Sequence, residues 1–136
     1  MLEQGVTGMK IWPFDFAAEA SNGTYISPAD LKKAIEPFEK IRAAVGDKMD
    51  IMCELHCMWN LTAVKKIARA LEPLEPFWYE DPMKMDNMRA LKEFADSTHI
   101  PVTASETLGG RGHFRELVEA RPPGSSCSIC PGSVAF

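Results

Sequence analysis

The stretch PFWYEDP, residues 76–82, contains a short apolar run that Glu80 closes and a turn follows. A short apolar run bounded by prolines predicts a buried strand. The pattern recurs 26 residues earlier, where MDIMCEL carries Glu54 near its end, and 26 residues later, where IPVTAS precedes Glu106. One strand and one helix fit this period, so the sequence predicts successive βα units.

The segments around these strands complete the pattern. GMKIW (8–12) predicts an earlier strand, and the turn-rich segment 13–26 predicts a long loop. Ser27 is the expected N-cap of a helix that Pro28 begins and Gly46 ends. Further helices are predicted at residues 61–72, 87–97 and 114–120. This alternation predicts an α/β fold with a parallel sheet.

Composition limits the function classes. The chain has 136 residues, a net charge of -4 and 46% hydrophobic residues. The negative charge argues against nucleic acid or an anionic membrane surface as a partner. No apolar run reaches the ~18 residues of a transmembrane helix, and the N-terminus shows no signal-peptide pattern. We therefore expect a soluble, cytoplasmic protein.

Three carboxylates are expected at one edge of the sheet. The carboxyl ends of parallel strands lie together, and in a closed βα barrel that edge carries the active site. Glu54, Glu80 and Glu106 would repel one another there unless a cation joins them. Ligation by oxygen alone suits Mg²⁺, so we predict a magnesium site. The alternative is that glutamates begin these loops by chance.

Four motifs carry a family resemblance. KIWPFD, ELHCMWN, FWYEDP and SETLGGR, in this order, resemble the barrel domain of the enolase superfamily, in its mandelate racemase and muconate lactonizing enzyme branch. The resemblance covers residues 5–120. It implies a partial (β/α)₈ TIM-type barrel of about four βα units. It also implies that the three glutamates bind Mg²⁺ and that the proton alpha to a substrate carboxylate is removed.

The proton-transfer residues depart from a common pattern of the family. Many relatives end the first of these strands with Lys-x-Lys, but this chain has Lys10 and Trp12. Lys10 is then an electrostatic aid or a solvated lysine. His56 is the candidate acid/base, because Glu-x-His is similar to the Asp-x-His of mannonate dehydratases. Strand alternation would place His56 on the face of Glu54, although a structural histidine is the alternative. Tyr25 is either a partner acid or a packing residue.

The resemblance favours acid-sugar dehydration with a small carboxylate substrate. A racemase, epimerase or cycloisomerase is the first alternative, and a non-catalytic fragment is the second. We expect a partial barrel domain at 1–120, without the capping domain and the C-terminal half of the barrel, and a homo-oligomeric parent protein. The tail 121–136, RPPGSSCSICPGSVAF, breaks the pattern where a fifth strand is due. We interpret it as a frameshifted or misassembled end.

Overall fold

The structure is a computed structural model that describes residues 2–104, 106–119 and 128–129. In this part of the chain one sheet contains five parallel strands that follow the sequence order. The strands are β1 (Gly8–Ile11), β2 (Asp50–Glu54), β3 (Trp78–Glu80), β4 (Val102–Ala104) and β5 (Ser128–Ile129). The predicted α/β class and parallel sheet are confirmed.

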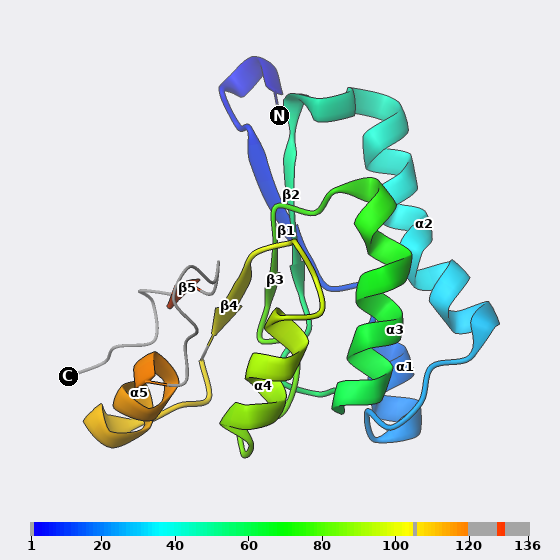
Figure 1. Cartoon of the computed structure of the whole chain (residues 1–136). Coiled ribbons are helices and arrows are strands. Elements are labelled where there is room, and N and C mark those ends of the chain that lie inside the picture. The colour runs from blue at the N-terminus through cyan, green and yellow to red at the C-terminus, as the bar shows by residue number, and fades with distance from the viewer. Residues whose placement is uncertain (1, 105, 120–127, 130–136) are drawn as a thin grey trace.

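The helices between the strands cover one side of the sheet. The helices are α1 (Asp15–Ser21), α2 (Pro28–Val45), α3 (Leu61–Leu71), α4 (Met88–Ala95) and α5 (Gly110–Glu119). Figure 1 shows α2, α3 and α4 on the same side of the strands. Short 3₁₀ turns occupy Leu2–Gln4, Gly46–Lys48 and Glu72–Leu74. A chain that crosses back on one side between parallel strands leaves the opposite face of the sheet without helices.

Polar side chains cap three of these helices at their first turns. Ser27 accepts a hydrogen bond from Asp30 N at 3.0 Å, as its predicted capping role requires. The side chain of Asn60 accepts one from Ala63 N at 2.8 Å. Asn87 caps α4 in the same way. Each cap satisfies an N–H group that has no partner within its helix, which fixes where the helix begins.

The segment between β1 and α2 differs from its prediction as a loop, because it contains α1. Phe14, Ala17 and Ala18 are buried, and their spacing places them on one face of a helical turn. Asn22 then ends the helix in the left-handed conformation, with φ of 51°. The burial of this short apolar face explains the helix, which the many turn residues around it concealed.

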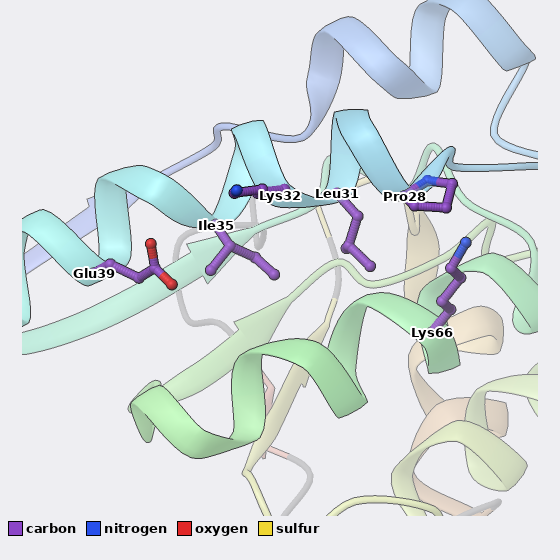
Figure 2. A pocket seen from close by; sticks show the side chains of 6 residues that line it. All are labelled: Pro28, Leu31, Lys32, Ile35, Glu39 and Lys66. Carbon is purple, nitrogen blue, oxygen red and sulfur yellow. The ribbon is translucent and has the colours of Figure 1, made fainter.

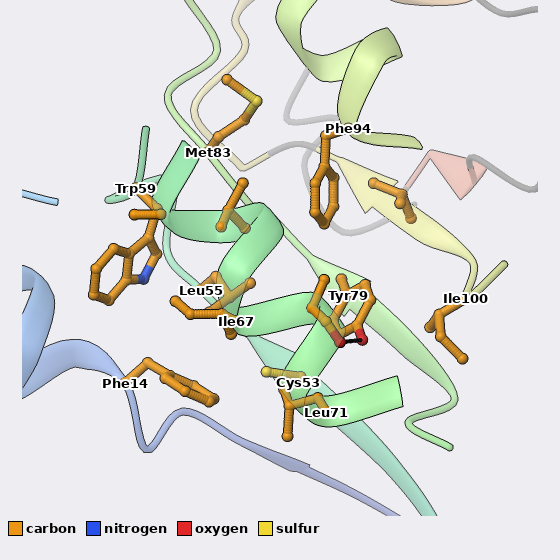
Figure 3. Packing of buried hydrophobic residues seen from close by; sticks show 14 of the residues in the cluster. Phe14, Cys53, Leu55, Trp59, Ile67, Leu71, Tyr79, Met83, Phe94 and Ile100 are labelled. Atoms are coloured by element: carbon orange, nitrogen blue, oxygen red, sulfur yellow. Dashed lines mark hydrogen bonds between the residues drawn. The ribbon is translucent and has the colours of Figure 1, made fainter. Parts of the chain in front are cut away.

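The hydrophobic core lies between the sheet and the helices (Figure 3). The side chains of Cys53, Leu55 and Tyr79 are fully buried there. The Tyr79 hydroxyl donates to the Ala68 carbonyl oxygen at 3.1 Å, so its one polar atom is satisfied inside the core. Burial raises the pKa of the Cys53 thiol, with a smaller contribution from the charge of Glu54.

The opposite face of the sheet carries the polar residues. Register pairs Glu54 with Glu80, and Glu80 with Thr103, so these three side chains lie side by side. Lys10 pairs with Met52, two positions before Glu54, and therefore shares the same face. Lysine and carboxylate side chains therefore lie on this face of the sheet, and the hydrophobic core lies on the other.

Two chain segments meet tightly beside the carboxyl ends of β1 and β2. An ideal Cβ on Gly23 would lie 1.8 Å from the Met58 carbonyl oxygen, and the φ of Gly23 is +69°. Asn60 N donates to the Gly23 carbonyl oxygen at 2.9 Å. Only glycine fits this contact, which attaches the segment after β1 to the segment after β2.

A pocket of about 270 Å³ lies on the helical side of the molecule, lined by residues of α2 and by Lys66 of α3 (Figure 2): Pro28, Leu31, Lys32, Ile35, Glu39 and Lys66.

Of the predicted tail 121–136, the structure describes only β5, which pairs with β4. The rest of the tail lies outside the described residues.

Within the described part of the chain, no helix combines the length and apolar character needed to cross a membrane.

Candidate functional site

Two buried carboxylates form the centre of the candidate site. Glu54 is the last residue of β2 and Glu80 the last residue of β3, and their Cα atoms are register partners. Glu54 is 3% exposed and Glu80 is 8% exposed. Like charges so close and so little hydrated need positive charge or hydrogen-bond donors nearby.

Lys10 supplies that positive charge. Its Nζ donates to Glu54 Oε2 and to Glu80 Oε1, each at 2.8 Å. Lys10 lies two register positions before the glutamates, and its long side chain spans this distance along the strand. Burial opposes the charge of Lys10, but the hydrogen bonds and charges of the two glutamates outweigh it and raise the pKa of the amine. Lys10 is therefore a charged bridge between the carboxylates.

The remaining oxygens of the two carboxylates also have donors. Glu54 Oε1 accepts from the backbone N–H groups of Leu55, at 3.1 Å, and His56, at 3.0 Å. Trp78 Nε1 donates to Glu80 Oε2 at 3.0 Å. Burial alone would raise the pKa of Glu54, but the hydrogen bonds from Lys10 and His56 outweigh burial and lower it. Glu54 is therefore ionised near neutral pH.

His56 lies in a turn that follows β2, not in the strand itself. β2 ends at Glu54, and His56 and Cys57 both adopt left-handed backbone conformations, with φ of 50° and 56°. Two consecutive non-glycine residues in this region are strained, and such strain concentrates at functional sites. Strand alternation therefore does not position His56, because β2 ends at Glu54 and a turn carries His56.

Asp15 and Trp12 both contact the His56 ring. His56 Nδ1 lies 3.2 Å from Asp15 Oδ1 and 3.0 Å from Asp15 Oδ2. The ring of Trp12 meets it edge-on, with centroids 6.2 Å apart. Burial lowers the pKa of His56, but the hydrogen bond and charge of Asp15, with smaller contributions from Glu54 and Glu106, raise it overall. The pKa of the imidazole therefore lies above its ordinary value, because several carboxylates are near the ring.

Asp81 is a further carboxylate at this edge, directly after Glu80. Asp81 is 1% exposed, and its Oδ2 accepts from Glu106 N at 3.0 Å. Its buried Oδ1 has no hydrogen-bond partner among the described residues. Burial and the charges of Glu54, Glu106 and Glu80 raise the pKa of Asp81 to about 6. A buried, incompletely satisfied carboxyl beside other carboxylates is a second sign that this edge suits a cation.

Glu106 follows β4 and is exposed. Its charge acts on both His56 and Asp81, which places it in the same acidic region. Among the described residues, no three histidine, cysteine, aspartate or glutamate side chains are grouped closely enough to hold a metal ion. The structure thus joins Glu54 and Glu80 through Lys10 and leaves Glu106 at the rim. The donor set itself, carboxylate oxygens around a bound cationic group, fits a hard divalent ion.

Tyr25 lies apart from these residues. Its side chain is 59% exposed, and Lys66 Nζ stands 5.3 Å from the ring centroid. None of the contacts found among the described residues links Tyr25 with Lys10 or His56. Asp15 and Asp81 are not among the site residues predicted from the sequence. Asp81 directly follows β3, and an acidic residue just beyond a parallel strand was the available signal for it. Asp15 lies four positions beyond the end of β1, in the KIWPFD motif, and no such signal marks it.

The sequence of this chain matches that of a known family. The sequence model of the family described as enolase C-terminal domain-like matches residues 1–122. The chain belongs to the enolase superfamily. A solved enolase of the mandelate racemase subgroup from Agrobacterium tumefaciens is 59% identical over 88% of this chain, with a TM-score of 0.84. This enolase-superfamily chain covers 33% of that structure, so its sheet corresponds to part of a barrel.

Two curated relatives of this enolase-superfamily chain are named for acid-sugar dehydration. The D-galactonate dehydratase of Ralstonia nicotianae is 30% identical over 64% of the chain. The D-gluconate dehydratase of Thermoproteus tenax is 27% identical over 79% of the chain. The chain spans 23% and 21% of these relatives, respectively.

Proposed function

We propose that this chain forms part of a Mg²⁺-dependent acid-sugar dehydratase that acts on an aldonate or aldarate. The observation that carries the proposal is the pair of buried carboxylates, Glu54 and Glu80, beside a histidine held by Asp15. The names of the two dehydratase relatives support the same reaction.

Glu54, Glu80 and Glu106 are the proposed magnesium ligands. Two observations support this proposal: Glu54 and Glu80 already share one cationic group, and the buried Oδ1 of Asp81 has no hydrogen-bond partner among the described residues. When bound, the ion would stabilise the negative charge that develops on the substrate carboxylate as the alpha proton leaves. Glu106 would have to turn inward from the rim to join the other two.

The chain's own basic residues have distinct proposed roles. His56 exchanges protons, since its imidazole lies beside the carboxylates and titrates above its ordinary range. Lys10, once it leaves the glutamates, offers an ammonium group to the substrate carboxylate. Tyr25 stays a proposed partner acid and would have to reach the site from its present place beside Lys66. In the overall reaction the alpha C–H and beta C–O bonds break, water leaves, and the enol product becomes a 2-keto-3-deoxy acid.

An isomerase of the same superfamily is the second candidate. It would remove the same alpha proton and return one to the same carbon, so it needs the same metal site. A non-catalytic role is the third candidate for the 136-residue polypeptide alone, because the chain spans only 33% of the solved relative from Agrobacterium tumefaciens. We expect that polypeptide to be insoluble, molten or oligomeric, and a monodisperse monomer with a cooperative melt would contradict this.

The deciding experiment tests the full-length protein that carries this segment. It is incubated with Mg²⁺ and a panel of aldonic and aldaric acids, and 2-keto acid formation is measured. A 2-keto acid from at least one sugar acid supports the dehydratase. Exchange of the alpha proton for deuterium in D₂O without a keto product would support the isomerase instead. Neither product nor exchange with any acid would overturn both proposals. The mass of the protein in solution tests the expected homo-oligomer.

A further inference from the structure

We infer that Asp15 is a positioning residue that holds His56 in one tautomer and one orientation for proton exchange. The inference rests on the proposed function, because it assigns a role to Asp15 through His56. Asp15 lies in a segment that the sequence predicted as a loop, and its distance in the chain from His56 hid the pairing.

The contact engages one particular ring nitrogen. Both oxygens of Asp15 approach His56 Nδ1, at 3.2 and 3.0 Å. An ionised carboxylate can only accept, so the pair requires a proton on Nδ1. The other ring nitrogen, Nε2, is then the one that can take up and release a proton. The side chains are 34% exposed for His56 and 27% for Asp15, which leaves the ring accessible to a small substrate.

The fold fixes the place of Asp15 from both sides. Phe14, its neighbour in the chain, is fully buried and packs on Phe38 of α2, with ring centroids 6.5 Å apart. On the other side, α1 buries Ala17 and Ala18 against the core. The carboxylate therefore projects from a backbone that is anchored before and after it.

Backbone hydrogen bonds and the ring of Trp12 fix the position of His56. Glu54 Oε1 accepts its backbone N–H at 3.0 Å, and Cys57 N donates to the Asp81 carbonyl oxygen at 2.8 Å. These bonds hold the left-handed turn, and the edge of Trp12 limits rotation of the ring. An imidazole confined by the backbone, a carboxylate and an aromatic ring is preorganised, so little reorganisation is needed at the moment of proton transfer.

This geometry has a direct chemical consequence. A carboxylate on one nitrogen of a histidine raises the basicity of the other nitrogen and stabilises the imidazolium that forms. Asparagine in its place can instead donate to Nδ1 and select the wrong tautomer. Asp15 thus affects the rate of proton transfer without touching the substrate.

The test uses Asp15→Asn in the full-length enzyme with its Mg²⁺. We expect kcat to fall by ~10² to 10⁴-fold, with KM and the melting temperature nearly unchanged. The matched control is Glu19→Gln, which makes the same acid-to-amide change at an exposed position of the same helix. It should leave kcat within twofold. Asp15→Glu should recover part of the loss, because it restores the carboxylate.

A double-mutant cycle separates positioning from a general structural role. If Asp15 acts through His56, then Asp15→Asn should cause no further loss in a His56→Asn background. Losses that multiply, or a normal kcat in folded Asp15→Asn while His56→Asn is inactive, would overturn the inference and leave the proposed function intact. Normal kcat in both single variants would instead remove His56 from the proposed mechanism.

A spectroscopic measurement keeps the inference testable if Asp15→Asn does not fold. ¹⁵N-histidine labelling of the unaltered enzyme reports which ring nitrogen of His56 carries the proton when the ring is neutral. We expect the proton on Nδ1. A neutral ring protonated mainly on Nε2 would contradict the contact with Asp15.

Discussion

Replacing Lys10 by methionine should increase the affinity of the site for Mg²⁺. The Lys10 ammonium occupies one oxygen each of Glu54 and Glu80, at 2.8 Å. An ion that binds both carboxylates must displace these contacts and must also tolerate a nearby positive charge. Methionine keeps the length and apolar stem of the lysine side chain and removes the charge, so the competition ends.

The size of the effect follows from the two hydrogen bonds. A hydrogen bond to a charged group contributes about 1.5 to 3 kcal/mol when sheltered. The Lys10 side chain is 39% exposed, so solvent screening reduces the two bonds together to about 2 kcal/mol. A difference of this size corresponds to a Kd for Mg²⁺ that is roughly 30-fold lower. Without metal, the same variant should be less stable, because its buried carboxylates lose their counterion.

Isothermal titration calorimetry of the chelator-treated full-length protein measures this Kd directly. The matched control is Lys40→Met, which removes a lysine from an exposed ion pair with Glu36 on α2. Its Mg²⁺ affinity should stay within twofold of the unaltered protein. An unchanged or weaker affinity in Lys10→Met would refute the reasoning, because it would mean that Lys10 does not compete with the ion.

Three further predictions address proton transfer, ionisation and packing. His56→Asn should lower turnover at least ~10²-fold while Mg²⁺ affinity stays within a few-fold, with His99→Asn at an exposed position as the control. The pKa of Asp81 is about 6 in the folded protein, against 3.8 ordinarily, so the folded state binds the extra proton between these values and loses stability as pH rises through them. Asp81→Asn should therefore stabilise the metal-free protein at pH 7 by up to about 3 kcal/mol in denaturant titrations, but not at pH 3.5. Gly23→Ala should destabilise by about 3 kcal/mol in the same assay, because its Cβ meets backbone. Gly46→Ala adds a Cβ in open space, at φ of +58° and ψ of -137°, so it carries backbone strain without a clash and should lose less stability than Gly23→Ala. Equal losses in both variants would argue against the close contact.

The sequence predicted the fold well because its local signals agree. The capping residue Ser27 marks a helix start that the structure confirms. The apolar runs closed by Glu54 and Glu80 gave the strands and their order. Such signals depend on neighbours in the chain, and they need no knowledge of long-range contacts.

The parts of the site that the sequence did not reveal depend on long-range geometry. The pairing of Asp15 with His56 joins residues 41 positions apart, and it needs the short helix α1 to exist. The contacts of Lys10 reach across 44 and 70 positions. Sequence periodicity places residues on a face, but it does not determine which donor meets which acceptor on that face. The left-handed turn at His56 was equally hidden, since no glycine marks it.

The two basic side chains at this edge have separate acidic partners, and this division matters for the proposed reaction. Lys10 neutralises Glu54 and Glu80, which are proposed ligands, whereas His56 is held by Asp15, which is not. An ion that bound the two glutamates would displace Lys10 and leave the contact between His56 and Asp15 in place. Lys10 would then be available to an anionic substrate, and His56 would keep its contact with Asp15. A histidine paired with one of the proposed ligands would lose its partner when the ion bound, so a separate partner, Asp15, would let the proposed site hold a metal ion and an oriented acid/base together.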